Sequence, residues 1–143
     1  MWTLLVTLAF TLYMTGMIWS MHVFEYPLFA SVGAEEFAAY HAAHNRRLPF
    51  FVILPSFLAL ASAIGLVWVH PAGMPGWLLV LVVALDLAVI VSTIVWQAPL
   101  HARLDREGYA AEVIGTLIRS NWIRTILWTL NALLLLGLAA RVL

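Results

Sequence analysis

The chain of 143 residues contains no cysteine and no lysine, and it has few charged residues of any kind. Without cysteine it cannot form disulfides, thiolate metal sites or a thiol nucleophile. Seven arginines balance seven acidic residues, so the formal net charge is zero and gives no reason to expect nucleic acid as a partner. Charged residues make up 10% of the chain, whereas a soluble domain typically carries about 25%. The chain therefore has too little polar sequence to cover itself in water.

Apolar residues make up 64% of the sequence, and the mean hydropathy is +1.00. Four apolar segments each have about 20 residues, the length that a helix needs to cross the hydrocarbon core of a bilayer. They cover residues 2–24, 49–69, 77–96 and 122–138. Tryptophans lie near several segment ends, as in the aromatic belts of membrane proteins. The sequence predicts one all-α domain over 1–143, an integral membrane up-down four-helix bundle.

The arginines lie almost entirely on one side of the predicted membrane. All except Arg141 fall in or beside the first and third connections. The positive-inside rule then places these connections in the cytoplasm and both termini outside it, as expected for a bacterial inner-membrane protein. The first connection predicts a short helix, because acidic residues at its start and Arg46 and Arg47 at its end complement the helix dipole. A second short helix is expected in the third connection, over 105–120.

Four of the five histidines are predicted to lie at this cytoplasmic face. His22 and Glu25 close the first span, His41 and His44 lie in the first connection, and His101 follows the third span. Residues three apart on a helix can point at one ligand, and histidines with one carboxylate suit Cu, Fe or Zn. The pattern predicts a transition-metal site made by the four histidines, with Glu25 either as a further ligand or hydrogen-bonded behind one of them. Two alternatives stay open: a catalytic histidine without metal, or histidines that only satisfy headgroups, helix ends and each other.

Asn121 and Arg124 begin the fourth span three residues apart. An arginine can hold an anionic group through two parallel hydrogen bonds. These two residues, together with His22 and His101, are therefore the candidate catalytic residues, with Asn121 and Arg124 orienting a substrate. The alternative role of Arg124 is to pair with Glu25 or with a lipid phosphate.

Asp86 lies near the middle of the third span, where an ionised carboxylate costs at least about 2.5 kcal/mol. A buried structural acid and a functional proton or substrate contact are both open interpretations.

Pro49 and Pro55 are expected to kink the second span and to free carbonyls near the site. Tyr26 and Pro27 predict a turn directly after the first span.

Four stretches, WSMHVFEYPLF, FAAYHAAHNRR, APLHARL and NWIRT, resemble the anthrone-oxygenase-like family of small four-helix membrane proteins. The resemblance covers most of the chain, from about Trp19 to Trp128. It implies oxygenation of a polyketide anthrone to an anthraquinone without a cofactor. His22, His101, Trp19 and Trp122 would then deprotonate and orient a phenolic substrate. The His-x-x-His pair in the first connection supplies more ligands than such a mechanism needs.

The leading hypothesis is a membrane-embedded oxidoreductase or oxygenase with a metal site at the cytoplasmic face. Its substrate would be a small hydrophobic molecule, phenolic or quinone-like, that enters from the lipid bilayer. Asp86, Trp19 and Trp122 are candidates for lining the substrate or proton path. The alternative hypotheses are a non-enzymatic transporter, a metal carrier and an assembly module. A homo-oligomer is compatible with each of these functions. A polar route from His22 past Asp86 to the outer side would favour a transporter, whereas an apolar plug would favour an enzyme.

Overall fold

The computed structural model describes residues 1–142, and within them the chain is helical with no strand. The helical segments are α1 (Trp2–Ser20), η1 (Met21–Glu25), α2 (Tyr26–Phe29), α3 (Ala34–Leu48), η2 (Pro49–Ile53), α4 (Leu54–Trp68), α5 (Gly76–Ser92), η3 (Thr93–Gln97), α6 (Ala98–Glu107) and α7 (Ala111–Ala139). They join into four long helices, Trp2–Phe29, Ala34–Trp68, Gly76–Glu107 and Ala111–Ala139, each long and apolar enough to cross a membrane. The predicted all-α four-helix architecture is confirmed.

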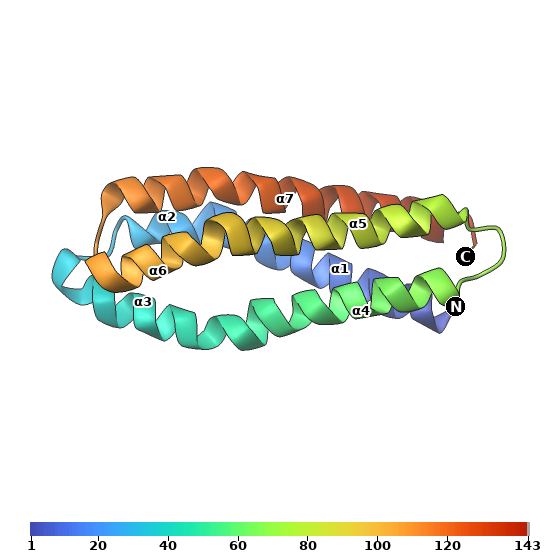
Figure 1. The fold of residues 1–143 in the computed structure, drawn as a ribbon, viewed down its shortest axis with the longest axis horizontal. Helices are drawn as coiled ribbons and strands as arrows, with labels where there is room; N and C mark the ends of the chain where they lie inside the picture. The colour runs from blue at the N-terminus through green and yellow to red at the C-terminus, as the bar shows by residue number, and fades with distance from the viewer. Residues whose placement is uncertain (143) are drawn as a thin grey trace.

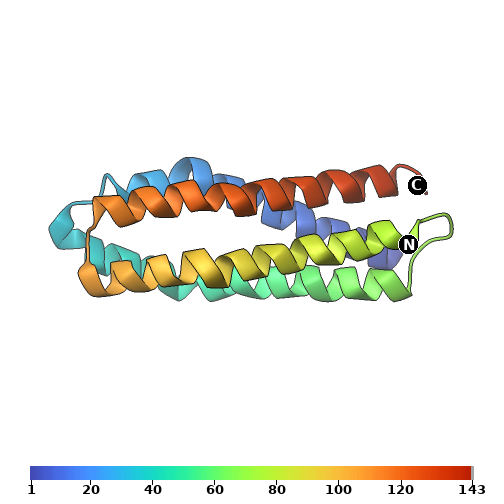
Figure 2. The ribbon, with the colours of Figure 1, turned by 45° about the horizontal axis from the view of Figure 1, so that its top comes forward.

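The four long helices run up and down, side by side (Figures 1 and 2). α1 packs against α4 and α7, and α5 packs against the same two helices, so the bundle is four-sided. Both termini and the loop over residues 69–75 lie at one end, here called the terminal end. The turns over 30–33 and 108–110 lie at the opposite end, here called the site end.

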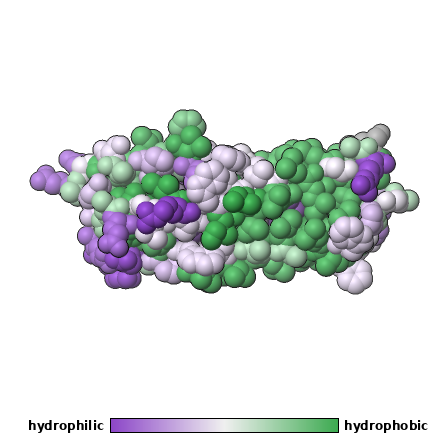
Figure 3. Space-filling view, turned by 90° about the horizontal axis from the view of Figure 1, so that it is seen from above, coloured by the Kyte–Doolittle hydropathy of each residue, from purple (hydrophilic) through white to green (hydrophobic). Residues whose placement is uncertain are grey.

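Large apolar side chains cover the outside of the bundle. Phe57, Val91, Ile94, Leu130 and Leu133 are each at least half exposed. Figure 3 shows this apolar surface over the middle of one face, with most hydrophilic residues gathered toward the site end. An apolar exterior of this extent fits helices that are solvated by lipid rather than water.

The helices at the site end extend beyond the predicted spans. The second helix has 35 residues, about 52 Å at 1.5 Å per residue, whereas the hydrocarbon core is about 30 Å thick. The short helix predicted in the first connection is confirmed as α3, and it continues directly into the second span. The turn expected at Tyr26 is wrong, because the chain stays helical to Phe29 and turns over 30–33.

The third connection is helical in two pieces rather than one. The prediction of a single helix over 105–120 is wrong, because α6 ends at Glu107 and α7 begins at Ala111. Gly108 between them has φ +72° and ψ −144°, a conformation that residues with a Cβ rarely adopt. This turn reverses the chain and sets α6 beside the start of α7.

Three of the long helices contain one π-helical turn each, at η1, η2 and η3. A proline follows two residues after the end of each turn, at Pro27, Pro55 and Pro99. Proline lacks an N–H and its ring collides with the carbonyl four residues earlier, and a widened turn accommodates that carbonyl. For Pro55 the freed carbonyl belongs to Phe51, and it accepts a 3.1 Å hydrogen bond from the Tyr13 hydroxyl. The second helix thus accommodates Pro55 through a π turn, a feature frequent at functional sites.

Candidate functional site

Three of the predicted histidines meet inside the site end. α3 carries His41 and His44, which are 1% and 7% exposed, and α6 carries His101, which is 9% exposed. The ring centre of His101 lies 5.2 Å from that of His41 and 5.5 Å from that of His44, and the His41 and His44 centres are 6.2 Å apart. These three residues are called the histidine cluster below.

A chain of hydrogen bonds passes through the histidine cluster. His41 Nδ1 lies 2.8 Å from an Asp105 carboxylate oxygen, and His41 Nε2 lies 2.9 Å from His101 Nδ1. His101 Nε2 lies 3.3 Å from the Tyr26 hydroxyl, which accepts a 2.9 Å bond from Arg124 Nη2. Every donor meets an acceptor if both imidazoles are neutral and each carries its proton on Nδ1. Burial favours these neutral forms, because a charged imidazole loses hydration.

His44 has a different arrangement. Its Nδ1 donates to a Glu25 carboxylate oxygen at 2.7 Å, and in the neutral ring this leaves the lone pair on Nε2. Nε2 is buried and has no hydrogen-bond partner among residues 1–142. Buried polar atoms are nearly always paired. Nε2 of His44 is therefore the ring nitrogen left for a ligand from outside residues 1–142.

Aromatic side chains hold the rings of the cluster in place. Phe29 is fully buried, and its ring stands edge-on to His44 with ring centres 5.0 Å apart. It also contacts His41 at 5.7 Å and His101 at 6.4 Å. Phe37 stacks on His41 at 5.6 Å with an interplanar angle of 11°. The imidazoles are thus positioned by a packed apolar wall as well as by carboxylates.

His22, by contrast, lies apart from the cluster. Its ring centre is 4.1 Å from that of Trp122 and 6.3 Å from that of Trp19. Its Nδ1 lies 3.4 Å from the Asn121 side-chain amide, and the Asn121 oxygen accepts a 3.0 Å bond from Arg124 Nε. The four predicted catalytic residues are therefore linked by side-chain contacts, but His22 is not placed beside the other histidines.

Glu25 and Arg124, the other charged residues predicted for the site, are both present there. Glu25 stands behind His44 rather than among the imidazoles. Arg124 is 4% exposed and bonds Tyr26 and Asn121. The predicted alternative of an Arg124–Glu25 ion pair is wrong, because Glu25 pairs with His44 instead.

Two cavities open beside the histidine cluster. One, of about 290 Å³, includes Glu25, Tyr40, His44 and Arg47 in its lining. The other, of about 270 Å³, has a polar part formed by Tyr26, Gln97, His101 and Arg124 and apolar walls from η2 and the start of α6. Met21, Leu48 and Val52 line both cavities. The cluster thus lies between two spaces large enough for small molecules.

Asp86 lies elsewhere, in a polar layer between two apolar clusters. Its carboxylate accepts a 2.8 Å hydrogen bond from the Asn131 amide, and both residues are 1% exposed. A buried cluster that includes Leu79 and Leu135 packs toward the terminal end, and another that includes Val89 and Trp128 packs toward the site end. No hydrogen bond within residues 1–142 joins Asp86 to the histidine cluster.

The Asp86–Asn131 pair gives a prediction about stability. Asn131→Ala is expected to lower the free energy of unfolding by about 1–3 kcal/mol, because it leaves a buried carboxyl group without its donor. Asp86→Asn keeps a hydrogen-bonding side chain of the same shape and is expected to cost less. Unfolding in a series of SDS mole fractions, followed by circular dichroism, measures both values. A larger loss for Asp86→Asn would contradict this account and would indicate that the carboxyl group itself is needed.

Sequence reasoning missed Tyr26, Asp105 and Phe29 as site residues. Asp105 follows His101 by four residues and Tyr26 follows His22 by four, so helical spacing alone could have drawn attention to both. The carboxylate of Asp105 is 51% exposed while its partner His41 is buried, which places this hydrogen bond at the edge of the site. Phe29 gave no such signal, because one phenylalanine among many apolar residues is not distinctive.

Comparison with known proteins adds nothing to this description: no family model, curated protein or solved structure matches the chain. The resemblance to the anthrone-oxygenase-like family stays a prediction. Within residues 1–142, no three His, Asp or Glu side chains are already set around a common point as metal ligands. The interpretation of the site rests on its own geometry.

Proposed function

We propose that the protein is a membrane-embedded oxidoreductase that binds a transition metal through His41, His44 and His101. The observation that carries the proposal is the buried, unpartnered Nε2 of His44 beside two further imidazoles. Three imidazoles on one tetrahedral ion have ring centres about 5 Å apart, given metal–nitrogen bonds of about 2.0–2.1 Å. The spacings of 5.2 and 5.5 Å from His101 to the other two rings are close to this value, and the His41–His44 spacing is longer at 6.2 Å.

The hydrogen bond between His41 and His101 supports the same proposal. Their facing nitrogens are 2.9 Å apart, and two nitrogens on a tetrahedral ion lie about 3.3 Å apart. If the two nitrogens separated by a few tenths of an ångström and the rings turned so that their lone pairs converged, a metal would replace the shared proton. Behind His41 and His44 stand the carboxylates of Asp105 and Glu25, the arrangement that orients histidine ligands in metal sites. Copper, iron or zinc would suit these nitrogens, and copper or iron would supply electron transfer.

The substrate in this proposal is a small hydrophobic molecule that reaches the site from the bilayer. Both cavities combine apolar walls with polar groups of the site, as expected for an amphiphilic ligand. The excess of arginines at this end of the sequence supports a cytoplasmic location of the site, with both termini outside, in a bacterial inner membrane. The apolar clusters on both sides of Asp86 favour an enzyme over a transporter with a continuous polar path.

A second candidate is acid–base catalysis without metal, as in the cofactor-free oxygenase interpretation. The hydrogen-bond chain from Asp105 through His41 and His101 to Tyr26 favours it. Such a chain can move a proton between solvent and a buried group by exchanging donor and acceptor roles at each imidazole. His101, which lines a cavity, would then serve as the general base.

Metal analysis separates these two candidates. Protein purified in mild detergent and incubated with Cu, Fe or Zn is expected to retain about one ion per chain after desalting. Mass-spectrometric elemental analysis measures the content, and electron paramagnetic resonance reports whether a copper or iron ion changes oxidation state with added reductant. Wild-type protein that retains no stoichiometric metal under all three conditions would contradict the metal site and leave acid–base chemistry as the better candidate.

A further inference from the structure

The buried arginine at the site has no negative partner. Arg124 is 4% exposed, yet no carboxylate among residues 1–142 lies within 4 Å of its guanidinium group. Its partners are neutral: the Tyr26 hydroxyl at 2.9 Å and the Asn121 side-chain oxygen. A buried charge costs several kcal/mol unless an opposite charge compensates it. No carboxylate of residues 1–142 is close enough to pair with Arg124, and a bound anion would supply the missing opposite charge.

The guanidinium group also lines a cavity that a ligand can enter. Arg124 contributes to the 270 Å³ cavity, together with Tyr26, Gln97 and His101. No hydrogen bond from Arg124 Nη1 to another residue is found within residues 1–142. The Gln97 amide donates to Ser120 at 2.8 Å, whereas its buried oxygen has no partner. The cavity therefore offers a cation and a free acceptor to one ligand head group.

The remaining walls of the cavity are mainly apolar. Pro49, Val52 and Ile53 come from η2, and Ala98 and Ala102 come from α6. Ile53 is 46% exposed on the outside of the bundle, so this wall reaches the apolar surface. Figure 1 shows the two long helices that carry these walls running next to each other at the site end. A hydrocarbon tail can thus lie between them while the head group reaches Arg124.

Asp105 also lines this cavity, but its carboxylate lies at the solvent-exposed edge. One carboxylate oxygen accepts from His41 at 2.8 Å, and both oxygens accept from the Asn45 amide at 3.0 and 3.1 Å. Asp105 is half exposed to solvent, whereas Arg124 is buried. Water therefore screens the negative charge of the cavity, and its buried charge is the positive one.

We infer that the substrate binds as an anion: an apolar molecule with one ionised oxygen head group, a carboxylate or a phenolate, paired with Arg124. This inference rests on the proposed function, since it names the chemical class of substrate for that site. The head group would accept hydrogen bonds from the guanidinium group. A protonated position on the same ligand could donate to the Gln97 oxygen.

The experiment uses metal-free protein in nanodiscs of zwitterionic lipid, so that its result does not depend on the metal proposal. Octanoate, pentafluorophenolate and neutral octanol are added at pH 8, and thermal unfolding is followed by tryptophan fluorescence. One or both anions are expected to raise the unfolding midpoint by about 5 °C at saturation, and octanol is not. The two anions distinguish a carboxylate from a phenolate head group. An equal effect of octanol, or no effect of either anion, would overturn the inference.

Two variants and a control assign the effect to this cavity. Arg124→Gln is expected to abolish the anion-dependent rise, whereas Arg119→Gln, an exposed arginine on the same helix, keeps it. If Arg124→Gln does not fold, Ile53→Trp decides, because an indole at the cavity wall fills the space for the tail and leaves Arg124 intact. Anion stabilisation that survives in the folded variants would overturn the inference. Metal binding is measured in a separate experiment on the wild type, so the failure of this inference would leave the proposed metal site untouched.

Discussion

Replacing His44 by alanine is expected to weaken metal binding by more than about 100-fold. The imidazole Nε2 of His44 is the one nitrogen of the histidine cluster that has no partner within residues 1–142. Loss of a carboxylate behind a metal-binding histidine already costs about 10–100-fold, so loss of the ligand itself should cost more. Titration of the apoprotein with copper or zinc, against a chelator of known affinity, measures the change.

Two further variants make this result specific to the cluster. Glu25→Gln keeps His44 in place but removes the charge behind its Nδ1, so affinity is expected to fall by about 10–100-fold. His70→Ala removes an exposed histidine from the loop at the terminal end and is expected to leave affinity unchanged. Equal binding in His44→Ala and His70→Ala proteins would contradict a metal site at the cluster.

Phe29→Ala is expected to be among the most destabilising single substitutions at the site end. The side chain is fully buried and contacts all three imidazoles of the cluster. It lies beyond the predicted first span, so the cost of a cavity in a water-soluble core applies, about 3–5 kcal/mol for Phe→Ala. Thermal or SDS-induced unfolding measures the loss of stability. Metal affinity should fall in parallel, because the rings lose the wall that positions them.

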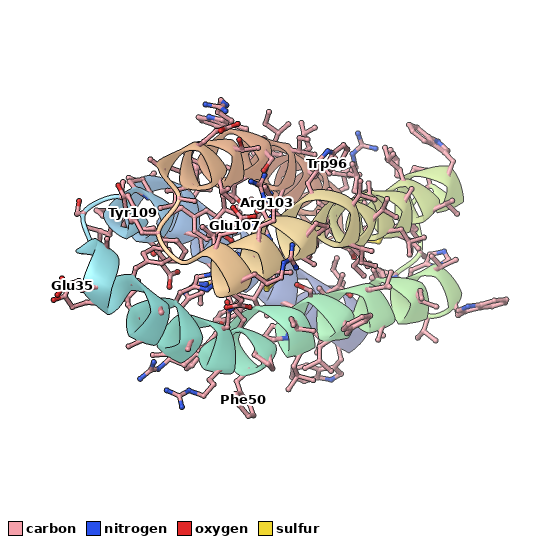
Figure 4. The ribbon with its side chains drawn as sticks, turned by 60° about the vertical axis from the view of Figure 1, so that its left-hand side comes forward. Glu35, Phe50, Trp96, Arg103, Glu107 and Tyr109 are labelled. Atoms are coloured by element: carbon pink, nitrogen blue, oxygen red, sulfur yellow. The ribbon has the colours of Figure 1, made fainter. Side chains whose placement is uncertain are left out.

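Phe50→Ala is the matched control for this substitution. Phe50 is 70% exposed and points away from the bundle in Figure 4. An exposed side chain without such contacts is expected to change stability by no more than about 0.5 kcal/mol. If both alanine variants lost the same stability, the effect would reflect removal of any aromatic side chain rather than the packing of the cluster.

Much of the fold follows from the sequence because length and hydropathy are properties of each segment by itself. Apolar runs of about 20 residues predict four helices able to span a membrane and their up-down order. His41 and His44 were predicted to point together, because three-residue spacing on one uninterrupted helix fixes their relative direction. Gly108, however, was not recognised as a break in the helix predicted over 105–120, because many helices tolerate a single glycine.

The composition of the site depended on contacts between helices that sequence spacing does not encode. Asp105 and Tyr26 reach the histidine cluster from α6 and α2, each bonded to a residue of another element. Arg124 was predicted at the site, but only the packed structure shows that its neighbours there are neutral. The charge that the cavity presents to a ligand is therefore a property of the assembled bundle.

The sequence by itself determined that this protein is an all-α chain with four helices able to span a membrane and with four of its five histidines toward one end. Only the tertiary structure decided which of those histidines meet. His22 lies within η1, and a π turn inserts one residue, which shifts the direction of the following side chains by about 100° relative to an unbroken α-helix. Regular 3.6-residue spacing therefore does not carry through the three π turns. For that reason depth along the helices could be predicted, whereas the partners of His22 could not.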